Sequence, residues 1–171
     1  MKKTLIMAIA ALLATIRGYA QELSVFVYDP GQEITNVRNA PGGKVVVKWK
    51  SDHAIMVLVD ENDGGWWHIV DNAYWDPEDE ESTGILAYTE SGYWIHQSVV
   101  AVSTRNYGGE SINLYENNDT VTPVVYTITE ETLLRPLYIL DEWVNVQTID
   151  GKHKGWIEKE WLCGNSVTTC P

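Results

Sequence analysis

The sequence predicts an all-β protein built from two small β modules in tandem. First, short segments of alternating polar and apolar residues recur along the chain, and Trp143 to Thr148 has the two-residue period of a strand. Second, turn signals separate these segments, and Asp150-Gly151 is a favoured pair for a tight hairpin turn. Third, a set of asparagine and tryptophan landmarks occurs twice with equal spacing.

The repeated landmarks indicate how many modules there are. The chain advances 30 positions from Asn36 to Trp66, and again 30 positions from Asn113 to Trp143. We interpret this as two copies of one small β module. Modules of this size have small cores, and the eight tryptophans offset that limit because each large ring buries much apolar area.

The first twenty residues have the pattern of an export signal. Lys2-Lys3 form a positive region, Leu5 to Ile16 form an apolar core too short to cross a bilayer, and Gly18-Tyr19-Ala20 form a small-residue cleavage site. We therefore expect a signal peptide at 1–20. The mature protein would be exported, either periplasmic or secreted, with no membrane insertion after cleavage.

The remaining chain divides into a first domain at 21–102 and a second at 103–171. Residues rich in β-branched and aromatic types predict the strands, and Gly, Pro, Asn and Asp clusters separate them. The strands expected in the first domain are 23–28, 34–38, 44–49, 53–60, 66–69 and 94–96. Those expected in the second are 113–115, 143–148 and 155–157, with about one helical turn at 158–162. Residues 99–103 contain no Pro/Ser linker, so we expect a strand there that both domains share.

This order of features resembles the bacterial SH3 (SH3b, SH3-like) domain family. The resemblance rests on Asn36-Val37-Arg38 followed by Pro41, on Gly65-Trp66, and on the closing Trp94-Ile95-His96. It implies two tandem SH3-like small β-barrels, and a ligand that is cell-wall peptide, peptidoglycan or an envelope protein. The second copy departs from the pattern, because Tyr115 stands where the first has arginine and the proline is missing.

The first domain also carries an insertion. Between Trp66 and Trp94 lie 28 positions, against 13 between Trp143 and Trp156, so about fifteen residues are added at about 72–88. They include an acidic run at 76–81. Carboxylates can bind Ca²⁺, but the run lacks the spacing of a cation loop and is interpreted as a solvated loop.

The only two cysteines, Cys163 and Cys170, lie close to the C-terminus. In an exported protein a disulfide is the default interpretation. It would close the tail of the second domain and stabilise it by about 2–3 kcal/mol. A redox or nucleophilic thiol is the alternative, although the spacing is not Cys-x-x-Cys.

The acidic composition limits the possible partners. Without the three basic residues of the signal peptide, nine basic residues remain against 24 acidic ones, a net charge of −15. This excess argues against nucleic acid, whose binding depends on Lys and Arg neutralising phosphates.

We expect no metal, no cofactor and no catalytic residues. The four histidines, at 53, 68, 96 and 153, are scattered without metal-ligand spacing. No Gly-x-Ser-x-Gly elbow marks a nucleophile. Paired carboxylates such as Glu142 and Glu158 stay open as an alternative, but nothing in the pattern distinguishes them.

The candidate ligand-binding residues are aromatic: Trp67, Tyr74, Trp75 and Tyr93. If Trp66 points into the core, strand alternation turns Trp67 outward. The alternatives are that the insertion covers Trp67, or that it lies in the contact between the domains. We therefore predict an exported, non-catalytic binding protein, and alternatively a structural or adaptor protein of a cell-surface complex. The oligomeric state is open.

Overall fold

The computed structural model describes residues 21–50, 54–75, 86, 89 and 92–170, with only the backbone described at 72–75. The expected signal peptide at 1–20 lies outside the described residues. So do the acidic run at 76–81 and His53.

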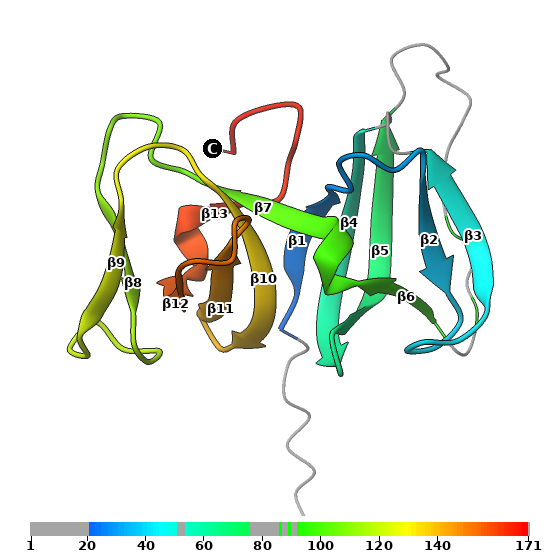
Figure 1. Ribbon diagram of the computed structural model, residues 1–171, viewed down its shortest axis with the longest axis horizontal. Helices are drawn as coiled ribbons and strands as arrows, with labels where there is room; N and C mark the ends of the chain where they lie inside the picture. The colour runs from blue at the N-terminus through cyan, green and yellow to red at the C-terminus, as the bar shows by residue number, and fades with distance from the viewer. Residues whose placement is uncertain (1–20, 51–53, 76–85, 87–88, 90–91, 171) are drawn as a thin grey trace, which may run out of the picture.

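The described chain consists of β-strands joined by turns and two short 3₁₀ segments, so the all-β prediction is confirmed (Figure 1). The strands of the first half are β1 (Leu23–Val27), β2 (Ile34–Arg38), β3 (Val45–Lys50), β4 (Ala54–Asp63), β5 (Trp66–Trp75) and β6 (Tyr93–His96), followed by η1 (Gln97–Val99). The second half contains β7 (Val100–Thr104), β8 (Ile112–Tyr115), β9 (Val124–Ile128), β10 (Leu133–Leu140), β11 (Trp143–Thr148), β12 (Lys154–Glu158), η2 (Lys159–Trp161) and β13 (Leu162–Cys163). No helix among the described residues is long and apolar enough to span a membrane.

The strands form one antiparallel sheet in the order β3-β2-β6-β5-β4-β1-β7-β10-β11-β12-β8-β9, with β13 added on β7. Strand β7 joins the two halves (Figure 1). It pairs with β1 through Val100 and Ala101, with β10 through Val102 and Ser103, and with β13 through Ser103 and Thr104. The expectation of a shared strand without a linker is thus confirmed.

The strand pairing is the same in both halves. The pairs β2–β3, β2–β6, β4–β5, β5–β6, β1–β4 and β1–β7 correspond to β8–β9, β8–β12, β10–β11, β11–β12, β7–β10 and β7–β13. Turn hydrogen bonds repeat too: Tyr28 N donates to Val99 O over 2.8 Å, and Arg105 N donates to Trp161 O over 3.0 Å. Both halves therefore follow one chain path.

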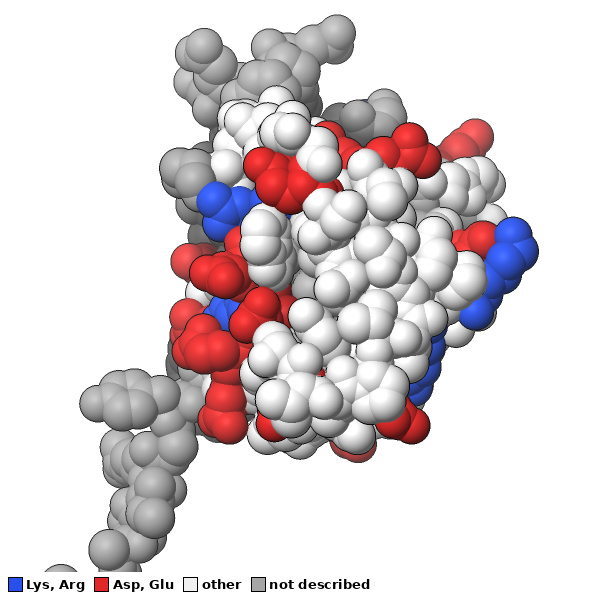
Figure 2. Space-filling view, turned by 90° about the vertical axis from the view of Figure 1, so that its left-hand side faces the viewer, with Lys and Arg blue, Asp and Glu red and all other residues white. Residues whose placement is uncertain are grey.

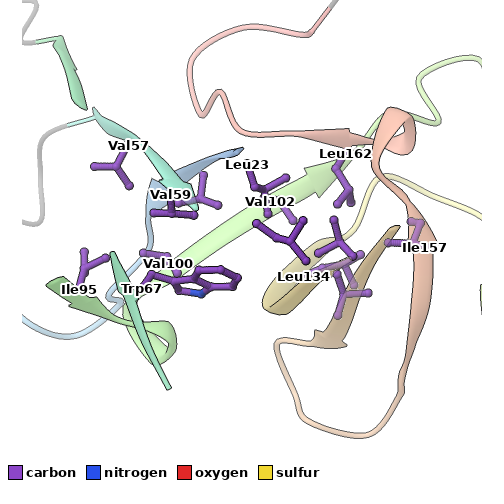
Figure 3. Packing of buried hydrophobic residues seen from close by; sticks show 14 of the residues in the cluster. Leu23, Val57, Val59, Trp67, Ile95, Val100, Val102, Leu134, Ile157 and Leu162 are labelled. Atoms are coloured by element: carbon purple, nitrogen blue, oxygen red, sulfur yellow. The ribbon is translucent and has the colours of Figure 1, made fainter. Parts of the chain in front are cut away.

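A single hydrophobic core runs through both halves (Figure 3). Val100 and Val102 of the shared strand are fully buried at its centre, with Val59 packed on one side and Leu134 on the other. The indole of Trp67 extends from the first half toward β10 (Figure 3). Burial on both sides of β7 explains why this strand is a nearly continuous apolar run.

Polar contacts also cross between the halves. Arg135 on β10 donates hydrogen bonds to the carbonyl oxygens of Val100, at 3.1 Å, and Gln97, at 3.5 Å. Burial lowers the pKa of Arg135, while Tyr28 and Asp29 act in the opposite direction. The guanidinium thus adds a donor at the end of the η1 turn, where Gln97 O also accepts a hydrogen bond from Val100 N.

Two turns are built as the sequence indicates. At the β11–β12 hairpin Gly151 takes φ 76°, which glycine adopts without steric cost. The Asp150 carboxylate there accepts hydrogen bonds from Thr148 Oγ1 and Lys152 N, at 2.6 and 3.1 Å. At the β4–β5 turn, Gly64 and Gly65 both have positive φ.

The predicted disulfide joins Cys163 to Cys170, with the Cα atoms 5.6 Å apart. The closed tail contacts the rest of the protein at two places. Cys170 N donates to the hydroxyl of Tyr107 over 3.3 Å, and Gly164 packs so closely on the Ser24 backbone that a Cβ atom would overlap it. A disulfide of this kind fits an oxidising, exported compartment.

Candidate functional site: the aromatic faces of the two halves

Trp67 does not face outward, and the structure has the alternative in which it lies in the contact between the domains. Trp67 is fully buried, and its Nε1 donates a hydrogen bond to Pro136 O over 3.2 Å. Alternation along β5 places Trp67 and Ile69 in the core and turns Trp66 and His68 toward the outer face. Trp67 therefore occupies the contact between the halves, and it cannot form part of an exposed binding surface.

The other predicted aromatic residues do not form the expected cluster either. Tyr93 is half-buried and packs against the core at the end of β6. Trp94 on β6 and Trp156 on β12 occupy equivalent positions in the two halves. The residue before each of them is Tyr93 in the first half and Gly155 in the second, so Gly155 stands in the position of Tyr93 on the core side. The backbone of Tyr74 pairs with Ile55 and that of Trp75 with Ala54, but these two side chains lie outside the described part.

The outer face of the first half carries one row of residues across neighbouring strands. Its members are aligned by the strand register: Val45 opposes Arg38, Arg38 opposes Trp94, and Trp94 opposes His68. Asp60 on β4 completes the row, because its Oδ1 lies 2.8 Å from His68 Nδ1. We call these five residues the first row.

A ring pair beside this row adds to the same face. Trp66 opposes His96, and their ring centroids lie 4.8 Å apart in an edge-to-face arrangement. The Arg38 guanidinium lies 5.3 Å from the Trp66 centroid, within the range of a cation–π contact. His68 lies 5.1 Å from the Trp94 ring. These contacts pack the rings and the guanidinium against one another on the outer face.

The outer face of the second half carries an equivalent row. Val124 opposes Tyr115, Tyr115 opposes Trp156, Trp156 opposes Asn145, and Asn145 opposes Tyr138. We call these five residues the second row. All are half-buried or exposed, and Tyr138 is 52% exposed.

Edge-to-face contacts also hold the second row. The Tyr138 and Trp156 centroids are 6.2 Å apart at an interplanar angle of 89°. Tyr115 and its neighbour Trp143 are 5.8 Å apart at 84°. Such pairs are favoured by the ring quadrupoles.

The two rows share backbone positions but differ in chemistry. The first contains Arg38 and the His68–Asp60 pair, so it presents hydrogen-bonding and charged groups beside a tryptophan. In the second, Tyr115 and Asn145 replace the arginine and the histidine, and the row contains no charged side chain. The two faces can therefore recognise different parts of a ligand.

The surface at the β8–β9 end is largely uncharged. Figure 2 shows a broad area without charged side chains there, bordered by acidic residues and, at its right-hand edge, by basic ones. Exposed valines belong to this end of the sheet: Val121 at 86%, Val124 at 48% and Val125 at 44%. The apolar second row thus continues onto an apolar strand edge.

An open cleft lies elsewhere on the first half. It has a volume of about 620 Å³, and it is lined by the loop from Asp29 to Ile34 and by Lys50. None of the described residues that line it is aromatic.

Two observations on the described part of the chain concern metal ligands and thiols. No group of three or more His, Cys, Asp or Glu residues there could hold a metal ion. Both cysteines are in the disulfide, so neither thiol is available as a nucleophile.

Comparison with known proteins gives only distant similarity. No protein-family model matches the sequence, and no curated protein is similar to it. Two solved structures from Trichomonas vaginalis, NlpC2 and NlpC1, are similar at 11% and 12% identity, with TM-scores of 0.31 and 0.32. The alignments cover 85% and 91% of this chain but 49% and 50% of those proteins, so the chain spans about half their length.

Proposed function

We propose that this chain is an exported, non-catalytic binding protein with two SH3-like modules, whose outer aromatic faces hold a cell-wall peptide, peptidoglycan or an envelope protein. The observation that carries the proposal is the repetition of one cross-strand row, centred on Trp94 in the first half and on Trp156 in the second. The repeated strand pairing supports the assignment of two SH3-like modules, each a small barrel around its part of the core.

Outward-facing aromatic rows favour binding over a purely structural role. A tryptophan on the outer face of a sheet contributes little to the core, whereas rings of this size dominate binding energies at interfaces. Polar groups beside the rings, namely Arg38 and His68 in one row and Asn145 in the other, supply the directional contacts that give specificity.

The export part of the proposal is supported by two independent features. The N-terminal segment has the pattern of a signal peptide. The Cys163–Cys170 disulfide is of the kind that persists in oxidising compartments.

Retention on insoluble peptidoglycan tests the proposal. The mature chain is mixed with purified peptidoglycan, and the pelleted fraction is compared for wild type, Trp94→Ala and Trp156→Ala. Each substitution is expected to lower retention, and thermal unfolding checks that the variants are folded. A wild-type chain that stays in the supernatant, and that captures no envelope protein from a detergent extract, would refute the proposal.

A role as an adaptor between proteins is the second candidate. Strands β3 and β9 form the two ends of the sheet order, and each exposes a pair of valines: Val45 and Val46 on β3, Val124 and Val125 on β9. Exposed, apolar edge strands can accept an added strand from a partner. Envelope-protein capture that is abolished by Val125→Pro, with peptidoglycan retention absent in wild type, would favour this candidate.

A further inference from the structure

We infer that the second row is a carbohydrate site, which takes an extended, uncharged glycan chain by stacking sugar rings on Trp156, Tyr138 and Tyr115. This inference rests on the proposed binding function and names the ligand class of one of its two faces. The first row, with its arginine and its His–Asp pair, is left to the charged or peptide part of a ligand.

The aromatic rings of the second row are arranged across neighbouring strands. Tyr115, Trp156 and Tyr138 lie on successive or near-successive strands of one row, so their spacing follows the regular separation of strands. In the Tyr138–Trp156 pair, the edge of one ring meets the face of the other. This contact covers only one of the four ring faces of the pair, and the partner ring leaves the other three uncovered. The electron-rich face of an aromatic ring attracts the C–H groups on one side of a pyranose.

The polar group at the centre of the row fits sugar hydroxyls. Asn145 lies between Trp156 and Tyr138, and its Nδ2 donates one long hydrogen bond, 3.4 Å, to Gly155 O. Within the described residues this is the only hydrogen bond of the amide, which has a second donor and a carbonyl acceptor. An amide offers both donor and acceptor, as a hydroxyl does, and carries no charge.

Charge decides between glycan types. The second row contains no ionisable group besides the tyrosine hydroxyls, and the uncharged face is bordered by acidic side chains and, at its right-hand edge, by basic ones (Figure 2). The whole chain has a formal charge of −12. An anionic polysaccharide would be repelled by this field, and it would find no cation in the row to neutralise it. A neutral glycan meets neither obstacle.

Another ring pair in the same half, Tyr126 and His153, is stacked face to face and serves as a comparison. Tyr126 and His153 are stacked with centroids 3.7 Å apart and an interplanar angle of 11°. Each ring covers a face of the other, so this pair offers less surface for a ligand. The second row avoids such self-stacking, which is what a stacking platform requires.

The test uses the mature full-length chain and measures binding by tryptophan fluorescence and by titration calorimetry. The probes are the hexasaccharide of N-acetylglucosamine, cellohexaose and a soluble cell-wall stem peptide. We expect at least one hexasaccharide to bind. Tyr138→Ala and Trp156→Ala should each weaken that binding by about tenfold or more, as loss of a central aromatic anchor does. Tyr138→Phe, which keeps the ring, should bind within about threefold of wild type.

Val167→Ala is the control, because Val167 is an exposed apolar residue of the disulfide-closed tail that belongs to neither row, and it should leave hexasaccharide binding unchanged. Tyr138 is exposed, so its substitution keeps the test valid if Trp156→Ala does not fold. Failure of both hexasaccharides to bind wild type would overturn the inference, as would binding that survives Tyr138→Ala and Trp156→Ala. Stem-peptide binding that these two substitutions abolish would assign the second row to peptide instead.

Peptidoglycan retention, measured in parallel, distinguishes failure of the glycan site from failure of the proposed function. A chain that is retained on peptidoglycan but binds no hexasaccharide refutes the glycan site and leaves the proposed function standing. A chain that does neither, and captures no envelope protein, refutes both.

Discussion

Trp67 of the first half donates its indole hydrogen bond to the carbonyl oxygen of Pro136 in the second half, over 3.2 Å. Both the ring and the bond are buried, so the contact combines apolar packing with satisfaction of a carbonyl that water cannot reach. It lies beside the shared strand β7, where the two halves form one core (Figure 3).

Trp67→Phe should therefore destabilise the whole protein. The substitution removes ring volume from a packed core and leaves Pro136 O without its donor, and we expect a loss of about 2–3 kcal/mol in the free energy of unfolding. Denaturation in urea measures this loss. Trp66→Phe on the outer face is the control and should cost less than about 1 kcal/mol. Equal costs at the two positions would contradict the assigned orientations.

The disulfide should contribute to stability through its short loop. The double variant Cys163→Ser/Cys170→Ser cannot form the disulfide. Its free energy of unfolding should be lower than that of wild type by about 2–3 kcal/mol, the value for a loop of this length. Wild type in reducing agent serves as the control, since it loses the same cross-link without a change in side-chain volume. An oxidised chain no more stable than the double variant would show that the tail is not restrained.

The Asp150 carboxylate should make the contribution of the β11–β12 turn to folding stability depend on pH. The hydrogen bond from Lys152, and next that from Thr148, hold the pKa of the Asp150 carboxyl well below its ordinary value of 3.8. Because the pKa is depressed in the folded state, the stabilisation is present above that ordinary value and is lost as the pH falls further.

Asp150→Asn should accordingly lower the melting temperature at pH 7, and the difference from wild type should shrink once the pH falls below 3.8. Thermal unfolding of both proteins at pH 7, 5 and 3 measures this. A difference that stays constant, or that grows toward pH 3, would contradict the assignment. Both charged groups are exposed, so added salt should reduce the difference at pH 7.

Period and turn chemistry were enough to predict the repeat and most of the strands, but β9 and β10 were not among the strands expected in the second domain. The Asn36–Trp66 and Asn113–Trp143 intervals match because both segments fold along the same path, and Asp150-Gly151 forms the expected hairpin turn. The shared strand was also predictable, since residues 99–103 are apolar and contain no linker signal.

The side of the sheet to which each tryptophan points was not predictable in the same way. Trp66 and Trp67 are adjacent and equally apolar, so alternation shows that they face opposite sides without showing which one is buried. The deciding contact comes from Pro136, 69 positions away. The strand register matches Gly155 with Tyr93, at a place where Val125 and Leu114 leave no room for a side chain.

The candidate site was missed for a related reason. The premise that Trp66 points into the core leaves out the outer face, on which Trp66, Trp94, Trp143 and Trp156 lie half-buried. The signal that could have located them outside was the polar character of their alternate neighbours, since His68 and Asn145 share their face.

We propose that the two outer rows form the ligand-binding surface. Peptidoglycan retention of the double variant Trp94→Ala/Trp156→Ala tests this, compared with wild type and with Trp67→Phe, whose ring is buried. The double variant, folded as judged by thermal unfolding, is expected to lose retention, while Trp67→Phe should keep it under conditions where it is folded. A folded double variant retained as well as wild type would show that the two rows do not bind the ligand.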